Sequence, residues 1–282
     1  MKCAWQAYLN LLPHWMRQEV DAYGQESLEE LRVRTGMQPE MSIQQGSRFL
    51  SKRATGDDVA FIINAASEYS PWAAKTIEKG FLTAGGGHRI GVCGVATVLD
   101  EKMRGISQPT SLCIRVARDF EGIAGKAVDI NGSVLIIGPP GSGKTTLLRD
   151  LIRCKSNAGQ GGVSVVDERQ ELFPLYKGQI CFPSGTRTDI LSGCKKAEGI
   201  EAVLRSMNPA WIAVDEITSP ADSEALLQAG WCGVNLMATA HAGSISDLKT
   251  RPIYRPLLEF KLFSTVLVLR KDKSWTMERI HV

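Results

Sequence analysis

The chain has 282 residues, of which 44% are hydrophobic and 22% are charged, and its formal net charge is +3. This composition is typical of a globular protein with one large domain or two ordinary ones. The small net charge argues against a surface that binds nucleic acid throughout, so we expect no specific nucleic-acid partner.

The sequence shows no clear pattern of a membrane span, a signal peptide or paired cysteines. No apolar stretch approaches the length of a membrane span, and polar residues interrupt the N-terminus where a signal peptide would be apolar. The seven cysteines are scattered without a C-x-x-C pair, which fits neither a zinc site nor a disulfide framework. We therefore expect a cytoplasmic protein, which a partner can hold at the cytoplasmic face of a membrane.

The first 36 residues contain apolar side chains at helical spacing. Trp5, Tyr8 and Leu12 can share one helical face, and Pro13 is expected to break or kink the helix. We expect this face to pack on its own domain. A surface for a membrane or a partner is the alternative.

The portion up to about residue 125 is predicted to be a small α+β domain. Strands are expected at 28–33, 81–83 and 110–118, and helices at 59–67 and 72–78. The glycine-rich stretch 85–94 is either a hairpin turn or a loop where a ligand approaches the backbone. The domain boundary is predicted near Gly125, which gives domains 1–125 and 126–282.

A phosphate-binding loop follows the boundary. Residues 138–145 fit the pattern G-x-x-x-x-G-K-[ST], between a predicted buried strand at 133–137 and a predicted helix at 145–153. The expected nucleotide-binding residues are Gly138, Pro139, Pro140, Gly141, Ser142, Gly143, Lys144, Thr145 and Thr146. Backbone N–H groups and the helix N-terminus would hold the polyphosphate, Lys144 would reach the β- and γ-phosphates, and Thr145 would ligate Mg²⁺.

The remainder alternates between strands and helices. Apolar strands are expected at 162–166, 211–214 and 234–239, and helices at 200–207 and 221–229. Such runs suit a parallel sheet that is buried on both faces. Residues 263–270 and 274–280 are expected to form an antiparallel hairpin at the sheet edge.

Polar residues follow three of these strands. Asp215 and Glu216 follow the strand at 211–214, where Asp215 would lie in the second shell of Mg²⁺ and Glu216 would polarise the attacking water. An acidic box at 167–171 ends the strand at 162–166, and His241 follows the strand at 234–239. Carboxyl ends of parallel strands converge at one crevice, so these residues are expected to meet there. Either Glu216 or an acid of the box, such as Glu168, could be the base.

The order of these motifs resembles that of the secretion ATPases, which include type II and type IV secretion motors and pilus-retraction motors. The resemblance covers most of residues 130–245. The glycine-rich stretch 85–94 and the sequence Val166-Asp167-Glu168-Arg169 are similar to the stage III sporulation protein AA family of endospore-forming bacteria. That similarity extends over nearly the whole chain.

The resemblance implies a RecA-like P-loop ATPase domain after a smaller α+β domain, with ATP and Mg²⁺ as cofactors. It also implies a homohexameric ring that binds nucleotide between the two domains and drives integral membrane proteins of a secretion-like complex. Arginines near the linker approach the phosphates in such proteins. Arg115 and Arg118 hold the matching positions, and Arg89 is a further candidate. An arginine fork there would neutralise charge on the γ-phosphoryl group.

The leading hypothesis is therefore an ATPase that drives a membrane-associated secretion or assembly apparatus in endospore formation. A nucleotide-dependent switch or scaffold with slow turnover is the first alternative. A P-loop small-molecule kinase is the second. It would need an acceptor pocket and an arginine lid, for which Arg187 is a candidate, but it gives the His241 box and the N-terminal domain no role. A GTPase is disfavoured because no [NT]-K-x-D motif occurs.

Overall fold

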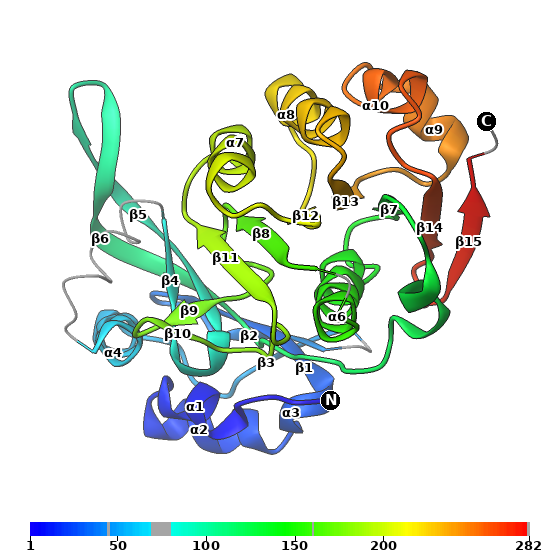
Figure 1. Cartoon of the computed structure of the whole chain (residues 1–282). Coiled ribbons are helices and arrows are strands. Elements are labelled where there is room, and N and C mark those ends of the chain that lie inside the picture. Colours follow the sequence, from blue (N-terminus) through cyan, green and yellow to red (C-terminus); the bar gives the residue numbers. More distant parts are fainter. Residues whose placement is uncertain (44–45, 69–79, 160, 281–282) are drawn as a thin grey trace. The chain divides into compact units, whose positions relative to one another are not determined.

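A computed structural model describes residues 1–43, 46–68, 80–159 and 161–280 (Figure 1). The chain divides into two compact units, each with its own sheet. Unit 1 contains Met1–Asp119 and Pro174–Phe182, and unit 2 contains Phe120–Phe173 and Pro183–Val282. The sequence predicts a single boundary near Gly125, whereas the chain passes between the units three times.

The first passage lies six residues before the predicted boundary because residues 120–125 are bound to unit 2. Asp150, which is fully buried, accepts hydrogen bonds from the backbone N–H groups of Gly122 and Ala124, at 3.2 and 2.6 Å. Arg153 donates to the same carboxylate. Asp150 and Arg153 lie on the helix that follows the phosphate loop, so this helix fixes the start of unit 2.

Unit 1 is built on a six-stranded sheet in the order β3-β2-β1-β6-β5-β4, with antiparallel pairing throughout. Its strands are β1 (Leu28–Arg34), β2 (Glu40–Ile43), β3 (Gly46–Phe49), β4 (Phe81–Thr83), β5 (Arg89–Leu99) and β6 (Lys102–Arg115). Strands predicted at 28–33, 81–83 and 110–118 correspond to β1, β4 and the second half of β6. The short strands β2 and β3 are not predicted from the sequence.

Helices α1 (Trp5–Asn10), α2 (His14–Asp21), α3 (Gly24–Ser27) and α4 (Gly56–Ser67) complete unit 1. Pro13 caps α2 and separates it from α1, as its missing N–H requires. Tyr8, Leu12 and Met16 are fully buried in the core of this unit, so the N-terminal helices pack on their own domain. The helix predicted at 72–78 lies outside the described residues.

A tight turn, η1 (Gly85–Gly87), joins β4 to β5, so the glycine-rich stretch begins as a hairpin turn. Gly86 and Gly87 have φ angles of +77° and +82°, which glycine adopts without strain. After the turn the same stretch continues as β5. The buried His88 accepts a hydrogen bond from the Ala117 N–H at 3.0 Å and donates to the Ala4 carbonyl oxygen at 3.0 Å, which is a structural role.

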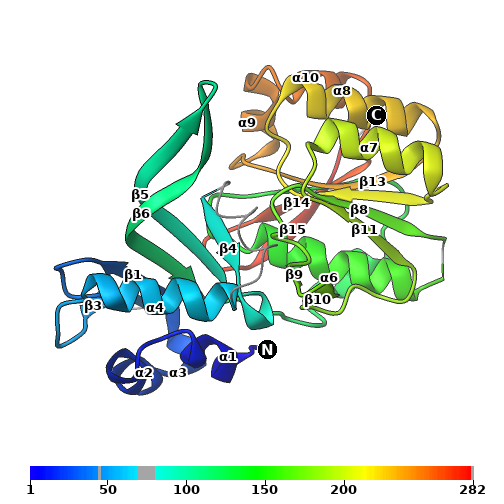
Figure 2. The same ribbon diagram turned by 90° about the vertical axis from the view of Figure 1, so that its left-hand side faces the viewer.

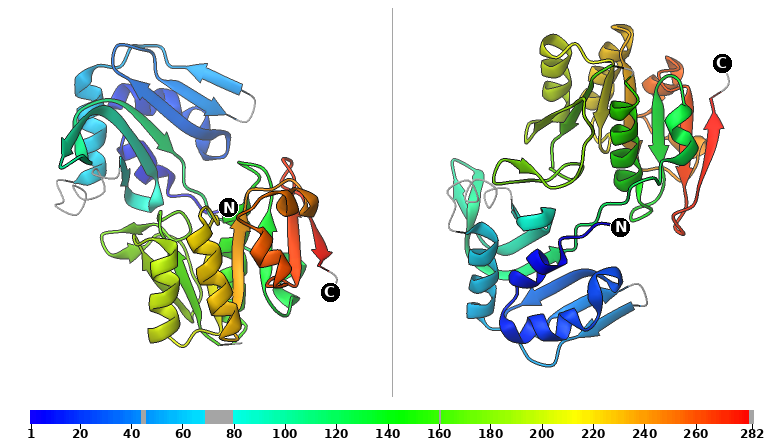
Figure 3. Two further views of the ribbon diagram at one scale, coloured as in Figure 1. Left: turned by 90° about the horizontal axis from the view of Figure 1, so that it is seen from above. Right: turned by 60° about the horizontal axis from the view of Figure 1, so that its bottom comes forward.

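Strands β5 and β6 pair over their whole length and form a strongly twisted ribbon (Figure 3). The register shifts three times along the ribbon, and each extra residue on β6 increases the local twist. Gly94 lies at one of these shifts. A Cβ atom there would be 1.9 Å from the Gln108 carbonyl oxygen, so only glycine permits this approach of the two strands.

A hairpin from the middle of the sequence belongs to unit 1. Its strands are β9 (Leu175–Tyr176) and β10 (Gln179–Ile180). The Tyr176 hydroxyl and the Lys177 ammonium group both bind the Glu68 carboxylate. A Cβ atom on Gly87 would lie 3.3 Å from Pro174, which shows how closely the hairpin packs on the η1 turn.

Unit 2 is built on a seven-stranded sheet in the order β11-β8-β12-β13-β7-β14-β15. Its strands are β7 (Val134–Ile137), β8 (Val163–Asp167), β11 (Thr188–Ser192), β12 (Trp211–Val214), β13 (Asn235–Ala240), β14 (Thr265–Leu269) and β15 (Trp275–Arg279). All pairs are parallel except β14–β15, which is antiparallel. The four predicted buried strands and the terminal hairpin are present, and β11 is an additional edge strand.

Helices cover both faces of this sheet (Figure 2). They are α6 (Lys144–Asn157), α7 (Lys196–Ser206), α8 (Pro220–Trp231), α9 (Ile245–Thr250) and α10 (Arg255–Glu259), with the 3-10 turn η2 (Gly125–Asp129) before β7. Helix α6 lies on one face, and α7, α8, α9 and α10 lie on the other. No helix in the described part of the chain is long and apolar enough to cross a membrane.

Candidate functional site

The phosphate loop connects β7 to α6. Gly141 and Gly143 have φ angles of +74° and +95°, with open space where a Cβ would lie. Gly138 is confined, because a Cβ there would be 2.9 Å from the Leu269 carbonyl oxygen on β14. Helix α6 begins at Lys144 without a side-chain cap, so the loop presents free backbone N–H groups at a helix N-terminus.

Lys144 is buried within this loop. Its ammonium group donates hydrogen bonds to the carbonyl oxygens of Gly138 and Pro139, at 2.9 and 3.0 Å. It also lies 3.2 Å from His241 Nδ1. Burial lowers the pKa of Lys144, while the carboxylates of Asp215 and Glu216 act to raise it.

The carboxyl ends of the central strands lie in register. Val166 on β8 pairs with Val214 on β12, and Val214 pairs with Ala238 on β13. The residues that follow these three are Asp167, Asp215 and Thr239, which therefore form a row along one edge of the sheet. The ends of the three strands that precede the acidic box, Asp215-Glu216 and His241 thus lie together at one edge of the sheet.

Asp215 is bound to the phosphate-loop helix. It accepts hydrogen bonds from the hydroxyl groups of Thr145, at 2.8 Å, and Thr239, at 2.6 Å. Thr239 is fully buried, and its oxygen accepts the backbone N–H of Glu216 at 2.7 Å. The Thr145 hydroxyl and the Asp215 carboxylate are thus placed together, and both are hard oxygen groups of the kind that magnesium prefers.

Glu216 adopts a left-handed backbone conformation with a φ of +50°. This geometry costs roughly 1–3 kcal/mol for a non-glycine residue and often occurs at functional sites. Its carboxylate lies 3.2 Å from His241 Nε2 and 3.7 Å from Arg169. Because the Lys144 ammonium group can only donate, His241 Nδ1 is the acceptor of that contact, which leaves Nε2 as the ring nitrogen that faces Glu216. A continuous chain of polar contacts therefore joins Lys144 to Glu216.

Asp167 takes a different role although it precedes Glu168 as Asp215 precedes Glu216. Its carboxylate is 2% exposed and accepts the backbone N–H groups of Glu171, Leu172 and Phe173, at 2.8 to 3.0 Å. Burial raises the pKa of Asp167 to about 6, although these amide donors act to lower it. Arg149 on α6 holds the carbonyl oxygens of the same loop. Asp167 thus shapes its own loop.

Glu168 forms an ion pair with Lys196, whose side chain is almost fully buried, at 2.7 Å. A small pocket is lined by both acidic strand ends, and its residues are Asp167, Glu168, Arg169, Glu171, Lys196, Asp215 and Glu216. Four acids in this pocket, Glu168, Glu171, Asp215 and Glu216, are partly exposed. Only Glu216 belongs to the chain of contacts that reaches Lys144.

The residues of the loop fit a nucleoside triphosphate with magnesium. Ser142 Oγ is buried and has no hydrogen-bond partner among the described residues, so the loop retains a polar atom for a ligand. No group of three or more His, Cys, Asp or Glu able to hold a metal ion occurs in the described ranges. Magnesium needs only one or two protein oxygens beside phosphate and water, which Thr145 and Asp215 can supply.

The three candidate arginines lie in unit 1. Arg118 donates to the carbonyl oxygens of Gln25, at 2.6 and 2.9 Å, and Leu28, so it supports the start of β1. Arg115 is 61% exposed and lies 3.5 Å from Glu30. Arg89 stacks on the Phe81 ring at 4.3 Å and is the strand partner of Arg115. Their predicted contact with nucleotide stays a prediction.

Three participants in this site are missing from the sequence-based set of site residues. Thr239 joins Asp215 to Glu216, Arg169 lies beside Glu216, and Lys196 neutralises Glu168. Thr239 could have been predicted as a site residue, because it lies two residues before His241 at the end of the same strand. Lys196 gave none, because its contact depends on the packing of α7 on β8.

A phosphate loop on a parallel sheet, with acidic strand ends beside it, defines a P-loop fold of the secretion-ATPase type. Solved structures share this fold. The ATPase DotB of Yersinia pseudotuberculosis aligns with a TM-score of 0.62 over 95% of this chain and 79% of its own, at 16% identity. The pilus retraction motor PilT, solved with bound ADP, aligns with a TM-score of 0.60 over 94% of this chain and 83% of its own, at 15% identity.

The family follows from the sequence comparison. The chain belongs to the family described as sporulation stage III, protein AA, whose family model matches residues 6–280. Stage III sporulation protein AA of Bacillus subtilis (strain 168) is 37% identical over 257 residues, which cover 88% of this chain and 84% of that protein. The resemblance seen in the glycine-rich stretch and the acidic box is thereby confirmed.

Proposed function

We propose that the chain is an ATP hydrolase. The observation that carries this proposal is the 2.8 Å hydrogen bond from Thr145 to Asp215. It joins the phosphate loop to a strand that ends in a second carboxylate, Glu216. Binding alone needs the loop, whereas hydrolysis also needs a carboxylate that can act on water.

Each residue has a distinct part in this proposal. The loop N–H groups and Lys144 bind and orient the β- and γ-phosphates. Thr145 and Asp215 hold magnesium, which supplies charge neutralisation on the phosphate oxygens when bound. Glu216 accepts a proton from the attacking water, and His241 orients the Glu216 carboxylate through Nε2. Glu168 is the less suitable base because Lys196 is bound to it.

The setting of the activity is a further part of the proposal. Family membership supports a role in endospore formation, and the fold supports a motor that works on a membrane-associated secretion or assembly apparatus. A hexameric ring would place nucleotide between domains, where Arg115 could neutralise charge on the γ-phosphoryl group. The exposure of Arg115 is compatible with this role, whereas the carbonyl contacts of Arg118 support a structural one.

The test is ATP turnover per subunit as a function of protein concentration, with Glu216→Gln as the blank. We expect turnover per subunit to rise with concentration, because a site completed between subunits needs assembly. Constant turnover would place a complete site within one subunit or within a preformed assembly. Absence of turnover above the blank would contradict hydrolysis by the isolated chain and favour a nucleotide-dependent switch.

A further inference from the structure

The last strand of unit 2 has an unpaired edge. In the described part of the chain, β15 pairs with β14 on one side only. The Ile280 N–H donates to the Ser264 carbonyl oxygen, and hydrogen-bonded pairs alternate along an antiparallel ladder. Trp275, Met277 and Arg279 therefore direct their backbone N–H and C=O groups away from β14. A strand that adds here finds a ready set of backbone partners.

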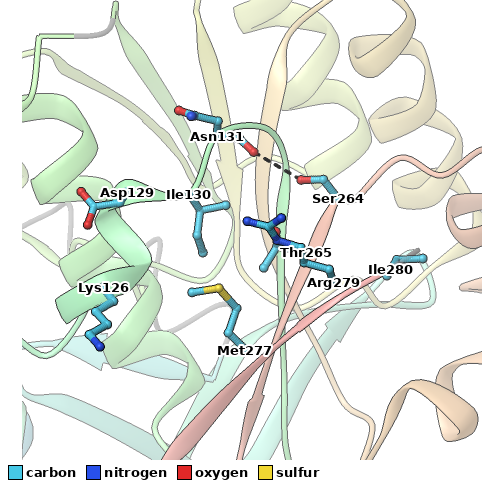
Figure 4. A pocket seen from close by; sticks show the side chains of 9 residues that line it. All are labelled: Lys126, Asp129, Ile130, Asn131, Ser264, Thr265, Met277, Arg279 and Ile280. Atoms are coloured by element: carbon cyan, nitrogen blue, oxygen red, sulfur yellow. Dashed lines mark hydrogen bonds between the residues drawn. The ribbon is translucent and has the colours of Figure 1, made fainter. Parts of the chain in front are cut away.

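This edge adjoins a pocket of about 730 Å³ within unit 2 (Figure 4). Met277 and Arg279 line it from β15, and Lys126 and Ile130 line it from η2 and the residue after it. Met277 and Arg279 are two residues apart, so their side chains lie on the same face of the strand. The residues with outward backbone groups are thus the ones that face the pocket.

The pocket carries an excess of positive charge. Lys126 and Arg279 line it, and Asp129 is the one acid among its lining residues. Among the described residues neither Lys126 nor Arg279 forms an ion pair, and no hydrogen bond occupies either side chain. Ile130 and Met277 add apolar side chains to the same lining. The two cations suit an extended segment that presents an acidic side chain at every second position, on the face toward the pocket.

A second copy of the chain fits this edge less well. Antiparallel pairing joins residues that have outward backbone groups, so β15 of a second copy would offer its own Trp275, Met277 and Arg279. Directly opposed residues share a face, and a second Arg279 would then join the two cations at the pocket. Charge complementarity therefore favours an acidic partner.

We propose that β15 and this pocket form a docking site for an extended acidic segment of a partner protein. The segment adds as an antiparallel strand to β15. Side chains alternate between the two faces of a strand, so acidic residues at every second position face the pocket together and bind Lys126 and Arg279. The proposal does not depend on the nucleotide site, and its test needs no ATP turnover.

The test uses a fluorescein-labelled peptide, Thr-Glu-Val-Glu-Val-Glu-Thr, and the full chain in a fluorescence anisotropy titration. We expect saturable binding that weakens at least tenfold with Arg279→Glu or Lys126→Glu. The charge-matched control Arg205→Glu, on the exposed surface of α7, should change binding less than twofold. Equal binding of a peptide with Lys in place of Glu would overturn the proposal.

Two further measurements separate strand addition from simple charge attraction. A peptide with N-methyl groups on alternate residues cannot complete the ladder, so it should bind at least tenfold more weakly. Met277→Pro removes an outward N–H, which edge strands tolerate, and it should weaken binding by a similar factor. Unchanged binding in both cases would overturn the proposal. Self-association in sedimentation that Met277→Pro abolishes, together with no peptide binding, would identify a second copy as the occupant and also overturn it.

Discussion

The ends of β8 and β12 carry the same dipeptide but use it differently. The dipeptide is Asp-Glu, which follows a valine in both cases (Val166 and Val214), and the two strands lie side by side in register. At the end of β8, Asp167 accepts the amides of its own loop and Glu168 pairs with the buried Lys196. At the end of β12, Asp215 binds Thr145 of the phosphate-loop helix and Glu216 faces His241.

The neighbours of each strand account for this difference. β12 pairs with β13, whose Thr239 positions both Asp215 and the Glu216 backbone. β8 lies one strand further from the phosphate loop. The two acids at its end, Asp167 and Glu168, bind the amides of their own loop and Lys196 instead. The same Asp-Glu pair therefore has different roles after β8 and after β12. Matched substitutions at the two strand ends can test this difference.

The largest difference is expected between Glu216→Gln and Glu168→Gln. If Glu216 is the base, its substitution lowers turnover about 10²- to 10⁴-fold while ATP stays bound. Glu168→Gln should lower turnover less than tenfold, because its amide can still accept a hydrogen bond from Lys196. Steady-state phosphate release and retained ATP measure both variants. A larger loss in Glu168→Gln would reverse the assignment of the two strand ends.

The second difference concerns stability against pH. The pKa of Asp167 is raised to about 6 from 3.8, so the folded state binds this proton more tightly than the unfolded state. The stabilisation of the folded state by this proton is fully present below pH 3.8 and is lost as the pH rises through about 6. This loss amounts to about 3 kcal/mol of the free energy of unfolding. The free energy of unfolding, measured with urea between pH 3.5 and 7, should include this loss in the native chain and not in Asp167→Asn. Parallel pH profiles of the two proteins would contradict the raised pKa of Asp167.

The third difference is in magnesium dependence. Asp215→Asn weakens the oxygen environment beside Thr145, so turnover at limiting magnesium should fall about 10- to 100-fold and the half-saturating concentration should rise. Asp167→Asn serves as the matched control and should leave the half-saturating concentration within a factor of about two. Magnesium titrations of turnover measure both. An equal shift in the two variants would mean that both strand ends hold the metal.

The smallest effect is expected for Lys196→Met. It removes the partner of the partly exposed Glu168 and replaces a buried ammonium group with an apolar side chain of similar length. We expect about 1 kcal/mol of lost stability in urea unfolding and turnover within twofold of the native chain. Turnover reduced tenfold or more would give the β8 strand end a catalytic part.

Local patterns predicted the elements whose residues are neighbours in the sequence. The phosphate loop, the buried strands and the pair Asp215-Glu216 are each recognisable from a few adjacent residues. The convergence of His241 with Glu216 was predicted from the rule for parallel strand ends. These features follow from the spacing of apolar residues and from the general topology of parallel sheets, so a single sequence is enough to predict them.

Features that depend on distant packing were not predicted. The acidic box left Asp167 and Glu168 open as bases, and only their contacts with the loop amides and with Lys196 distinguish them. Arg118 matches the family pattern, yet the carbonyl oxygens at the start of β1 occupy its guanidinium group. The boundary near Gly125 was displaced because Asp150, 25 residues further on, binds the linker.

The hairpin of β9 and β10 has a consequence for dissecting the molecule by gene truncation. Neither unit is encoded by one uninterrupted stretch, because Pro174–Phe182 folds with unit 1. A fragment that ends at Asp119 lacks this hairpin and leaves the η1 turn and Glu68 uncovered. A complete unit 1 needs the hairpin supplied as a grafted insertion or as a separate peptide.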